Sequence, residues 1–455
     1  MKRLLKEKAD LPNIPETWCW MSFPEATELI STSGKKLKKG EYSDTGDYPV
    51  IDQGEDFIGG YTDEAENVIK VDDPLIIFGD HTKCIKFVDF PFVPGADGIK
   101  VISPKEIYHP KCLYYFLKYL PLPDKGYSRH FKYLKKSFIP VPPLSEQVRI
   151  VAKIEELFSK LDSGVSELQK GTERLKQYRL SLLKAAFEGK LSKQARTENG
   201  WGVAWDFEEH EDPPDILEIP PEWRWIEVGA AIASLRNGIY KPKEYYNDDG
   251  IASLRMYNIE DGQIVWKDIK RMELTDEELE KYRLEPGDLL VNRVNSRELV
   301  GKAAAIPEGL EECVFESKNI RVKPTEAVQG EYLGHWFYLF RKRHFMSQVK
   351  QTVGQATVTQ TQIKQMPLPL APIAEQDEIL KKIERQESIL SDIQQQLSSN
   401  LTRAERLRQS ILKRAFEGNL VPQDSTEEPS APDGGDPNLE PGKQTTLSEV
   451  TSDVE

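Results

Sequence analysis

Few residues of this sequence are spaced as a catalytic site would require. An acid–base pair at Asp80-His81 has neither a nucleophile nor a metal ligand beside it, so a turn or a DNA-facing loop explains it better than catalysis. The nearest match to the Asp/Asn-Pro-Pro-aromatic loop of adenine methyltransferases is 212–215, where Asp215 replaces the aromatic residue. A phosphate-binding G-x-x-x-x-G-K-S/T pattern is absent, which argues against ATP hydrolysis. The six histidines show no metal-ligand spacing. The sequence therefore predicts no catalytic, cofactor-binding or metal-binding residue.

Residue types that bind DNA are better represented. Residues 125–136 interleave lysines and an arginine with aromatic side chains. Lysine and arginine neutralise phosphates, and arginine also reads guanine in the major groove. Residues 341–344 and 354–360 hold the same place in the second half, with glutamine and threonine that can bond bases or phosphates. The DNA-contact candidates are Lys35, Lys36, His81, Thr82, Lys125, Tyr127, Arg129, His130, Lys132, Arg255, Asn258, Asn292, Arg293, Asn295, Arg341, Arg343, Gln355, Thr357 and Gln360.

The elements that must position these residues are ordered by an internal repeat. Residues 139–147 match 368–376, and 181–189 match 410–418, both at an offset of 229 residues (147 to 376 and 189 to 418). Repeats of this kind are the first feature to seek, because they define the architecture. Different sequences precede the two copies. This order favours a constant frame carrying two different reading domains, although a plain duplication would give the same pattern.

A weaker repeat, 14–20 against 219–225, opens each half. We predict an α+β fold with two globular target-recognition domains, two long antiparallel coiled-coil helices and a pseudo-two-fold internal repeat. The predicted segments are recognition domain 1 at 1–143, long helix 1 at 144–190, a linker at 191–216, recognition domain 2 at 217–371, long helix 2 at 372–420, and an acidic, disordered tail at 421–455.

The repeated segments show the periodicity of coiled-coil helices. Apolar residues recur at steps of three and four, the 3.5-residue period of a helix seam. A narrow apolar stripe is marginal in an isolated helix, so the two copies are natural partners for each other. They would then act as a spacer between the domains, or form an ordinary helical hairpin with no spacing role. The predicted seam residues are Ile154, Leu161, Leu168, Leu175, Leu182, Ile383, Leu390, Leu397, Leu401 and Ile411.

Composition limits the cellular setting. The net charge is −14. Residues 421–455 hold nine acids and one lysine, a net of −8, which leaves −6 for the rest. DNA affinity must therefore come from local basic patches. Four dispersed cysteines and the lack of a membrane-length apolar run predict a cytoplasmic protein with no membrane partner.

The duplicated set of motifs resembles the specificity subunit of type I restriction–modification systems. Each recognition domain of that family opens with a Pro…Trp segment, closes with a Pro-x-Pro-Pro-Leu-x-Glu-Gln run, and precedes a long helix ending near Ala-Phe-Glu-Gly. These features appear here at 140–147 and 186–189, and again at 367–376 and 415–418. Ala371 departs from the pattern where a proline is expected, and the acidic tail departs from it as well.

The resemblance implies a division of labour. Each recognition domain reads one half of a bipartite site in double-stranded DNA, and the helices fix the spacer and hold two methyltransferase subunits. Endonuclease/translocase subunits join the full complex. The chain itself is then not an enzyme and holds no cofactor, whereas S-adenosylmethionine, ATP and magnesium are expected on the partners. Two alternatives stay open: a helical adaptor that does not read DNA, and a self-sufficient enzyme.

Overall fold

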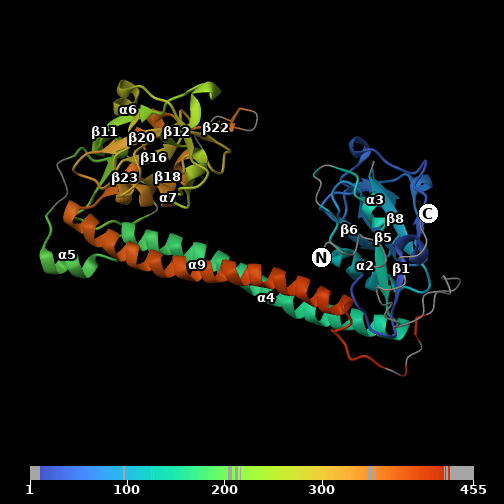
Figure 1. Cartoon of the computed structure of the whole chain (residues 1–455). Helices are drawn as coiled ribbons and strands as arrows, with labels where there is room; N and C mark the ends of the chain where they lie inside the picture. Colours follow the sequence, from blue (N-terminus) through green and yellow to red (C-terminus); the bar gives the residue numbers. More distant parts are fainter. Residues whose placement is uncertain are drawn as a thin grey trace. The chain divides into compact units, whose positions relative to one another are not determined.

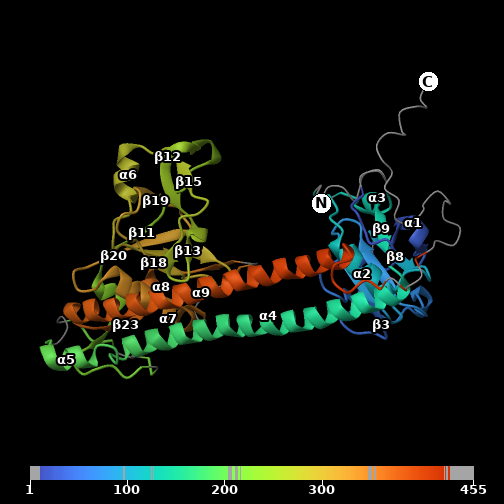
Figure 2. The ribbon, with the colours of Figure 1, turned by 60° about the horizontal axis from the view of Figure 1, so that its bottom comes forward.

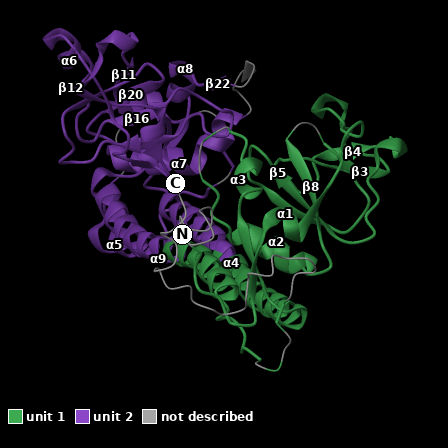
Figure 3. Ribbon diagram, turned by 45° about the vertical axis from the view of Figure 1, so that its right-hand side comes forward, with its two compact units in different colours: residues 1–168, 399–455 green, residues 169–398 purple. Residues whose placement is uncertain are grey.

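The computed structural model describes residues 11–95, 98–123, 126, 128–202, 207–210, 214–215, 217–346, 351–352, 355–424, 426 and 429–430. The chain forms two compact units (Figure 3): unit 1 comprises 1–168 and 399–455, and unit 2 comprises 169–398. The division by compactness thus cuts both long helices, and each unit takes a part of each. Among the described residues, no helix is both long and apolar enough to cross a membrane.

The globular part of unit 1 is an α+β domain (Figure 1). Its four-stranded sheet has the order β2-β8-β5-β6, its three-stranded sheet has the order β4-β3-β7, and β1 pairs with β9. The core lies between the larger sheet and α2, where Phe78 and Phe116 are fully buried. The elements are β1 (Cys19–Ser22), α1 (Phe23–Ala26), β2 (Thr27–Ile30), β3 (Tyr48–Ile51), β4 (Gly60–Thr62), β5 (Leu75–Gly79), β6 (Ile85–Val88), β7 (Val93–Pro94), β8 (Ile99–Pro104), α2 (Pro110–Tyr119), α3 (Phe131–Leu134) and β9 (Phe138–Val141).

The globular part of unit 2 repeats this topology. Its sheets have the orders β11-β20-β16-β18 and β15-β12-β19, and β10 pairs with β23. The central pairing of the smaller sheet is parallel in both units, β3 with β7 and β12 with β19. Two domains with little sequence in common therefore share one fold, which the internal repeat of their borders alone did not require.

Unit 2 adds elements to the shared topology. The additions are the β13–β14 hairpin, α6 and a small sheet of order β17-β22-β21. The elements are α5 (Lys193–Asn199), β10 (Arg224–Glu227), β11 (Ile232–Asn237), β12 (Tyr246–Leu254), β13 (Ile259–Glu260), β14 (Gln263–Ile264), β15 (Lys270–Met272), α6 (Asp276–Tyr282), β16 (Leu289–Asn292), β17 (Val294–Asn295), β18 (Ala303–Ala305), β19 (Cys313–Phe315), β20 (Asn319–Pro324), α7 (Gly330–Met346), β21 (Gln351–Thr352), β22 (Gln355–Thr357), α8 (Gln360–Lys364) and β23 (Pro367–Leu370).

Two helices of 44 residues each, α4 (Leu144–Phe187) and α9 (Ile373–Phe416), carry the repeated sequences. Within each unit, their segments run side by side and antiparallel (Figures 1 and 2). All ten predicted seam residues are buried or half-buried. In unit 2, a Cβ placed on Gly171 would lie 3.5 Å from the Leu397 side chain of the other helix, an ordinary van der Waals distance, so α4 and α9 pack closely at this point.

Each helix ends against the opening proline of a globular domain. Gly189 ends α4 with a φ of +65°, and Gly418 follows α9 with a φ of +72°. This left-handed conformation is typical of a glycine that ends a helix. A Cβ on Gly189 would overlap Pro220, and one on Gly418 would overlap Pro15. The repeated glycines are thus required by backbone conformation and by close packing.

The repeated Glu-Gln pair fastens each helix to a globular domain. Glu146 and Glu375 are fully buried. The indole N–H of Trp18 donates to Glu146 at 2.8 Å, and that of Trp223 donates to Glu375 at 2.9 Å. Because a buried carboxylate needs hydrogen-bond donors, the tryptophan of the opening motif and the glutamate of the closing motif form one structural joint.

The neighbouring glutamines complete the joint through the main chain. Gln147 accepts a hydrogen bond from the His109 N–H at 2.7 Å, just before α2. Gln376 accepts one from the Gln329 N–H at 2.9 Å, just before α7. Each side-chain amide also donates to two backbone carbonyls. The Glu-Gln repeat is therefore a folding signal in both units.

Candidate nucleic-acid interface

One edge of the larger sheet gathers the predicted residues of unit 1. Strands β2 and β5 end and β8 begins at this edge, as the pairs Ile30↔Val101 and Gly79↔Ile99 show. The loops that follow β2 and β5 carry Lys35, Lys36, His81 and Thr82. Thr82 and Lys36 are exposed, whereas Lys35 and His81 are half-buried. We call this border, with the loops that leave it, the reading edge of unit 1.

Asp80 connects the β5–β6 loop to the segment that enters α3. Its carboxylate accepts the Phe131 N–H at 2.8 Å, and its carbonyl accepts the His130 N–H at 2.8 Å. The carboxylate is thus used to hold two loops together. Gln53, which follows β3, completes the arrangement: its carbonyl accepts the Thr82 hydroxyl at 2.7 Å, and its side-chain oxygen accepts the His81 N–H at 3.2 Å.

Arg129, just before α3, and Lys132, within α3, place two cations at the reading edge of unit 1. Arg129 and Lys132 are exposed, and the Lys132 ammonium lies 5.0 Å from the Tyr133 ring centroid. By contrast, His130 is fully buried, with Nδ1 3.1 Å from the Asp80 carbonyl. Its side chain supports the loop, so we leave it out of the DNA-facing set. Lys125 and Tyr127 lie outside the described residues.

The equivalent edge of unit 2 gathers the second set. Strands β11 and β16 end and β20 begins here, as the pairs Asn237↔Ile320 and Asn292↔Asn319 show. Two predicted residues lie just beyond β12: Arg255, half-buried, donates to the Asp268 carbonyl at 2.6 Å, and Asn258 is almost fully buried. We call this border, with its loops, the reading edge of unit 2.

Asparagines form a hydrogen-bonded row along this edge. Asn295 donates to Asn292 at 2.8 Å, and Asn292 donates to Asn319 at 3.1 Å. Asn292 is fully buried, and Asn258 donates to the Val265 carbonyl at 3.0 Å. Burial and these bonds give Asn258 and Asn292 a structural role, so both leave the DNA-facing set, whereas half-buried Asn295 stays.

The β17–β22 pairing brings the remaining candidates beside this row. Val294 pairs with Thr357 and Asn295 with Ala356, which places half-buried Asn295 beside the strand that begins at exposed Gln355. The carbonyl of half-buried Arg293 accepts the Val358 N–H at 2.9 Å. Gln360, at the start of α8, donates to Asn237 at 3.2 Å. Segments more than 60 residues apart in the sequence thus meet at one edge.

The two arginines of α7 differ in their surroundings. Arg341 is half-buried and donates to the Glu298 and Val300 carbonyls at 3.0 and 3.2 Å, and burial lowers the pKa of its guanidinium. Arg343 is exposed. Arg341 therefore anchors the β17–β18 loop, and Arg343 is the freer of the two to meet a ligand.

Sequence reasoning missed residues that shape both edges. Gln53 and Asn319 act through partners more than 20 residues away, so no local pattern marked them. Glu316 accepts the Met256 N–H at 3.3 Å, and burial raises the pKa of its carboxyl above its ordinary value. Glycines were the available signals of close approach: a Cβ on the left-handed Gly98 would lie 2.8 Å from Gln53, and one on Gly238 would overlap the Glu316 carbonyl.

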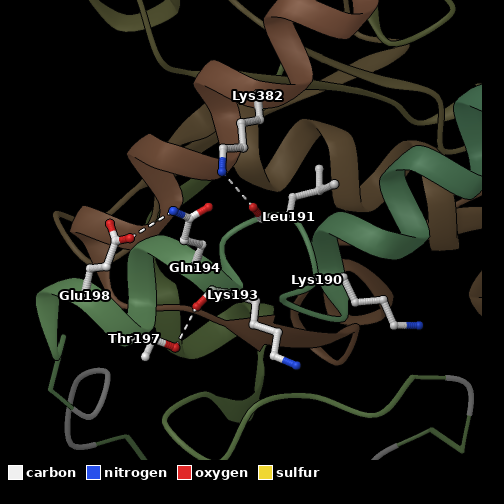
Figure 4. A pocket seen from close by; sticks show the side chains of 7 residues that line it. All are labelled: Lys190, Leu191, Lys193, Gln194, Thr197, Glu198 and Lys382. Carbon is white, nitrogen blue, oxygen red and sulfur yellow. Dashed lines mark hydrogen bonds between the residues drawn. The ribbon is translucent and has the colours of Figure 1, made fainter.

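The described residues contain no cluster of histidine, cysteine, aspartate and glutamate side chains able to hold a metal ion. An open hollow lies where α4 meets α5 (Figure 4). Lys382 donates there to the Leu191 carbonyl at 2.8 Å, and Gln194 donates to Glu198 at 2.9 Å. The Thr197 hydroxyl donates to the Lys193 carbonyl at 3.0 Å, so these three bonds hold the turn between α4 and α5 together.

Comparison with known proteins explains the repeat. The model of the family described as "Type I restriction modification DNA specificity domain" matches residues 15–170 and 232–403, which is most of the chain and both halves of the repeat. The chain belongs to this family. The specificity domain thus occurs twice, once with each globular part and its long-helix segment.

Several relatives are specificity subunits. The chain is 30% identical to the type I restriction enzyme EcoKI specificity subunit of Escherichia coli strain K12, over 64% of this chain and 59% of that protein. It is 23% identical to the EcoDI specificity subunit of Escherichia coli, over 89% and 90% respectively. The match to the first relatives, including StySPI of Salmonella potsdam at 29% identity, thus spans only about three-fifths of their length.

A solved structure shares the fold of this chain. The solved chain belongs to a structure described as the structural basis of complex assembly and conformational transition of the type I R-M system. It matches with a TM-score of 0.60 and 18% identity, over 90% of the present chain and all of that one. The α+β fold with repeated domains and long helices, predicted from the sequence, is confirmed.

Proposed function

We propose that this chain is the sequence-specific DNA-recognition subunit of a type I restriction–modification complex. One observation carries the proposal: two domains that share the topology of their two main sheets present different side chains at equivalent edges. A shared frame with different edge residues suits two domains that read different half-sites of double-stranded DNA. The exposed candidates for contact are Lys36, Thr82, Arg129 and Lys132 in unit 1, and Arg343 and Gln355 in unit 2; half-buried Lys35, His81, Arg255, Arg293, Asn295, Arg341, Thr357 and Gln360 border them.

The long helices are proposed to hold two methyltransferase subunits and to set the unread spacer. Apolar side chains that face away from the seam support this role. Tyr178 of α4 is 50% exposed, and Ile389, Ile393 and Leu407 of α9 are 49%, 39% and 49% exposed. Apolar residues held in solvent along a helix are typical of a surface that a partner covers.

The chain is proposed to do no chemistry of its own. S-adenosylmethionine would sit on the methyltransferase subunits, and ATP and magnesium on endonuclease/translocase subunits that complete the complex. The assembly is expected in the cytoplasm.

Modified-base mapping tests the function. The full chain is produced with the methyltransferase subunit of its system, and adenine methylation is mapped across the host genome with and without the chain. A gapped, bipartite methylated motif that needs the chain supports the proposal. Replacing residues 11–138 with another recognition domain should then change one half of the motif only. Identical methylation with and without the chain, despite confirmed assembly, would favour a helical adaptor that does not read DNA.

A further inference from the structure

Two tyrosines at the reading edge of unit 2 leave most of their side-chain surface in solvent. Tyr240 is 77% exposed and Tyr257 is 64% exposed, the highest values among the large apolar side chains that the structure describes. Exposing an aromatic ring of this size to water is unfavourable. Two such rings at one edge indicate a surface that becomes covered when a ligand binds.

Both tyrosines sit on backbone fixed by the same residue. Tyr240 follows Ile239, whose N–H donates to the Phe315 carbonyl at 3.0 Å and whose backbone bridges to Glu316. Tyr257 follows Met256, whose N–H donates to the Glu316 carboxylate at 3.3 Å. Glu316 therefore ties together the two loops that bear the rings.

Close packing at Gly238 fixes the first loop further. A Cβ on Gly238 would overlap the Glu316 carbonyl, so only glycine allows the loop after β11 to approach the β19–β20 connection. The second loop is held by Asn258, which accepts the Arg255 N–H at 2.9 Å. The Arg255 guanidinium also lies 5.7 Å from the Tyr257 ring centroid. Rigid loops that present exposed rings lose little conformational entropy when they bind.

We propose that Tyr240 and Tyr257 contact base edges in the half-site read by unit 2 and help to select the bases of that half-site. This inference rests on the proposed function. Tyr240 lies three residues after Asn237, the last residue of β11, whose side chain accepts a hydrogen bond from Gln360 at 3.2 Å. The loops of this edge therefore carry both exposed rings and amide groups of the kind that bond bases. Apolar side chains in the major groove contact the thymine methyl group, and an adenine methylation site always pairs its adenine with thymine.

Among the residues that the structure describes, unit 1 has no equivalent pair of exposed tyrosines at its reading edge. The parallel bridges Leu37↔Gly95 and Ile239↔Glu316 occupy the same place in the two units, which aligns Tyr240 with Lys38. The aligned position thus carries a cation in unit 1 and an aromatic ring in unit 2. We therefore expect the tyrosines to act on one half-site only.

The test uses the full chain assembled with the methyltransferase subunit, and compares Tyr240→Ala, Tyr240→Phe and Tyr257→Ala with the unaltered chain. Tyr245→Ala is the matched control, because Tyr245 is 41% exposed but its ring is covered by the Lys241 ammonium at 4.6 Å. Methylation is mapped genome-wide, and binding is measured on a duplex bearing the mapped site and on a duplex without it.

The proposal predicts relaxed methylation at one or more positions of a single half-site for both alanine variants, with the other half-site unchanged. Affinity for the site-bearing duplex should fall about tenfold, as for loss of one base contact, and Tyr240→Phe should retain it because the ring is kept. Replacing thymine by uracil in that half-site removes the methyl group. This change should reduce DNA binding by the unaltered chain more than it reduces DNA binding by the Tyr240→Ala variant.

Three results overturn the proposal: an unchanged motif for both alanine variants; equal losses on both duplexes, the behaviour of a phosphate contact; or a Tyr245→Ala effect as large as theirs. Each leaves the gapped motif itself in place. Failure of the proposed function instead removes the motif for the unaltered chain, so the two failures are distinct.

Discussion

The guanidinium of Arg179 on α4 lies 2.8 Å from the carboxylate of Glu387 on α9, and both side chains are 15% exposed. The 229-residue offset places Arg408 and Phe158 at the equivalent positions (408 for 179, 158 for 387). There the Arg408 guanidinium lies 4.6 Å from the Phe158 ring centroid. One seam position is thus joined by an ion pair in unit 2 and by a cation–π contact in unit 1.

The difference predicts unequal coupling energies. A double-mutant cycle of Arg179→Leu and Glu387→Leu should give a coupling of about 1.5–3 kcal/mol, because the pair is hydrogen-bonded and largely shielded from water. In unit 1, Arg408 also forms an ion pair with Asp162, and these side chains are 37% and 60% exposed. A cycle of Arg408→Leu and Asp162→Leu is therefore the control. Exposed pairs contribute at most about 1 kcal/mol. Calorimetric unfolding measures both cycles, and a larger control coupling would contradict the assignment.

The two buried glutamates should also differ in their tolerance of neutralisation. Glu375 accepts hydrogen bonds from Arg196 at 2.5 Å and from the Ser192 hydroxyl at 2.6 Å, whereas Glu146 accepts one from the neutral Gln423 amide at 2.6 Å. Glu375→Gln removes the nearer carboxylate of the shielded Arg196 guanidinium, which then keeps only the more distant Glu222 at 3.6 Å, and should destabilise the chain by about 2–3 kcal/mol. Glu146→Gln should cost less in the same melting experiment, because Trp18 and Gln423, which donate to this carboxylate, are neutral. Equal losses would show that Arg196 contributes nothing to the joint.

Burial predicts a pH dependence in unit 2. Burial lowers the pKa of His335 below its ordinary value near 6.5; Glu387 opposes this shift, and Arg179 adds to it. The unfolded chain then binds more protons than the folded one, so stability falls as the pH drops through about 6.5 toward the folded pKa. The Tm of the unaltered chain should therefore fall more steeply than that of His335→Gln between pH 7.5 and pH 5.5. Parallel profiles for the two chains would remove His335 as the cause.

The two exposed cations of unit 1 should make different contacts with DNA, Arg129 with a base and Lys132 with a phosphate. Arg129→Ala should cost about 1–3 kcal/mol on the site-bearing duplex and relax one position of the half-site read by unit 1, as expected for an arginine bonded to guanine. Lys132→Ala should weaken binding to all DNA alike and reduce the salt slope by about 1, as expected for a phosphate contact. Titrations at several salt concentrations separate the two, and a uniform loss for Arg129→Ala would assign it to the backbone.

Much of the frame was readable from the sequence, because the repeat and the seam are regular patterns. The offset of 229 residues revealed both long helices, and an apolar period of 3.5 residues identified the side chains that line them. The repeated Trp, Glu-Gln and Gly positions were visible as motifs. The periodicity predicted a helix wherever it was sustained, since helical packing depends on residues close in the sequence.

For the reading edges, the sequence predicted the chain segments involved but not which of their side chains face outward. The segments around His81, Arg129, Asn295 and Gln360 lie at these edges, and their contact with DNA stays a prediction. Which members face outward depended on burial: His130, Asn258 and Asn292 have suitable chemistry but face inward. A polar side chain serves a buried joint or a ligand equally well, so its type does not reveal its direction.

The sequence by itself determined the repeated order of domains and helices, the seam, and the absence of catalytic motifs, because each is written in residues close together or at a constant offset. Only the tertiary structure decided that two dissimilar domains share one sheet topology, that Trp18 meets Glu146 and Asp80 meets Phe131, and that Tyr240 and Tyr257 are carried on loops joined by Glu316. These relationships arise from strand pairing between distant segments, which packing selects and local sequence does not encode.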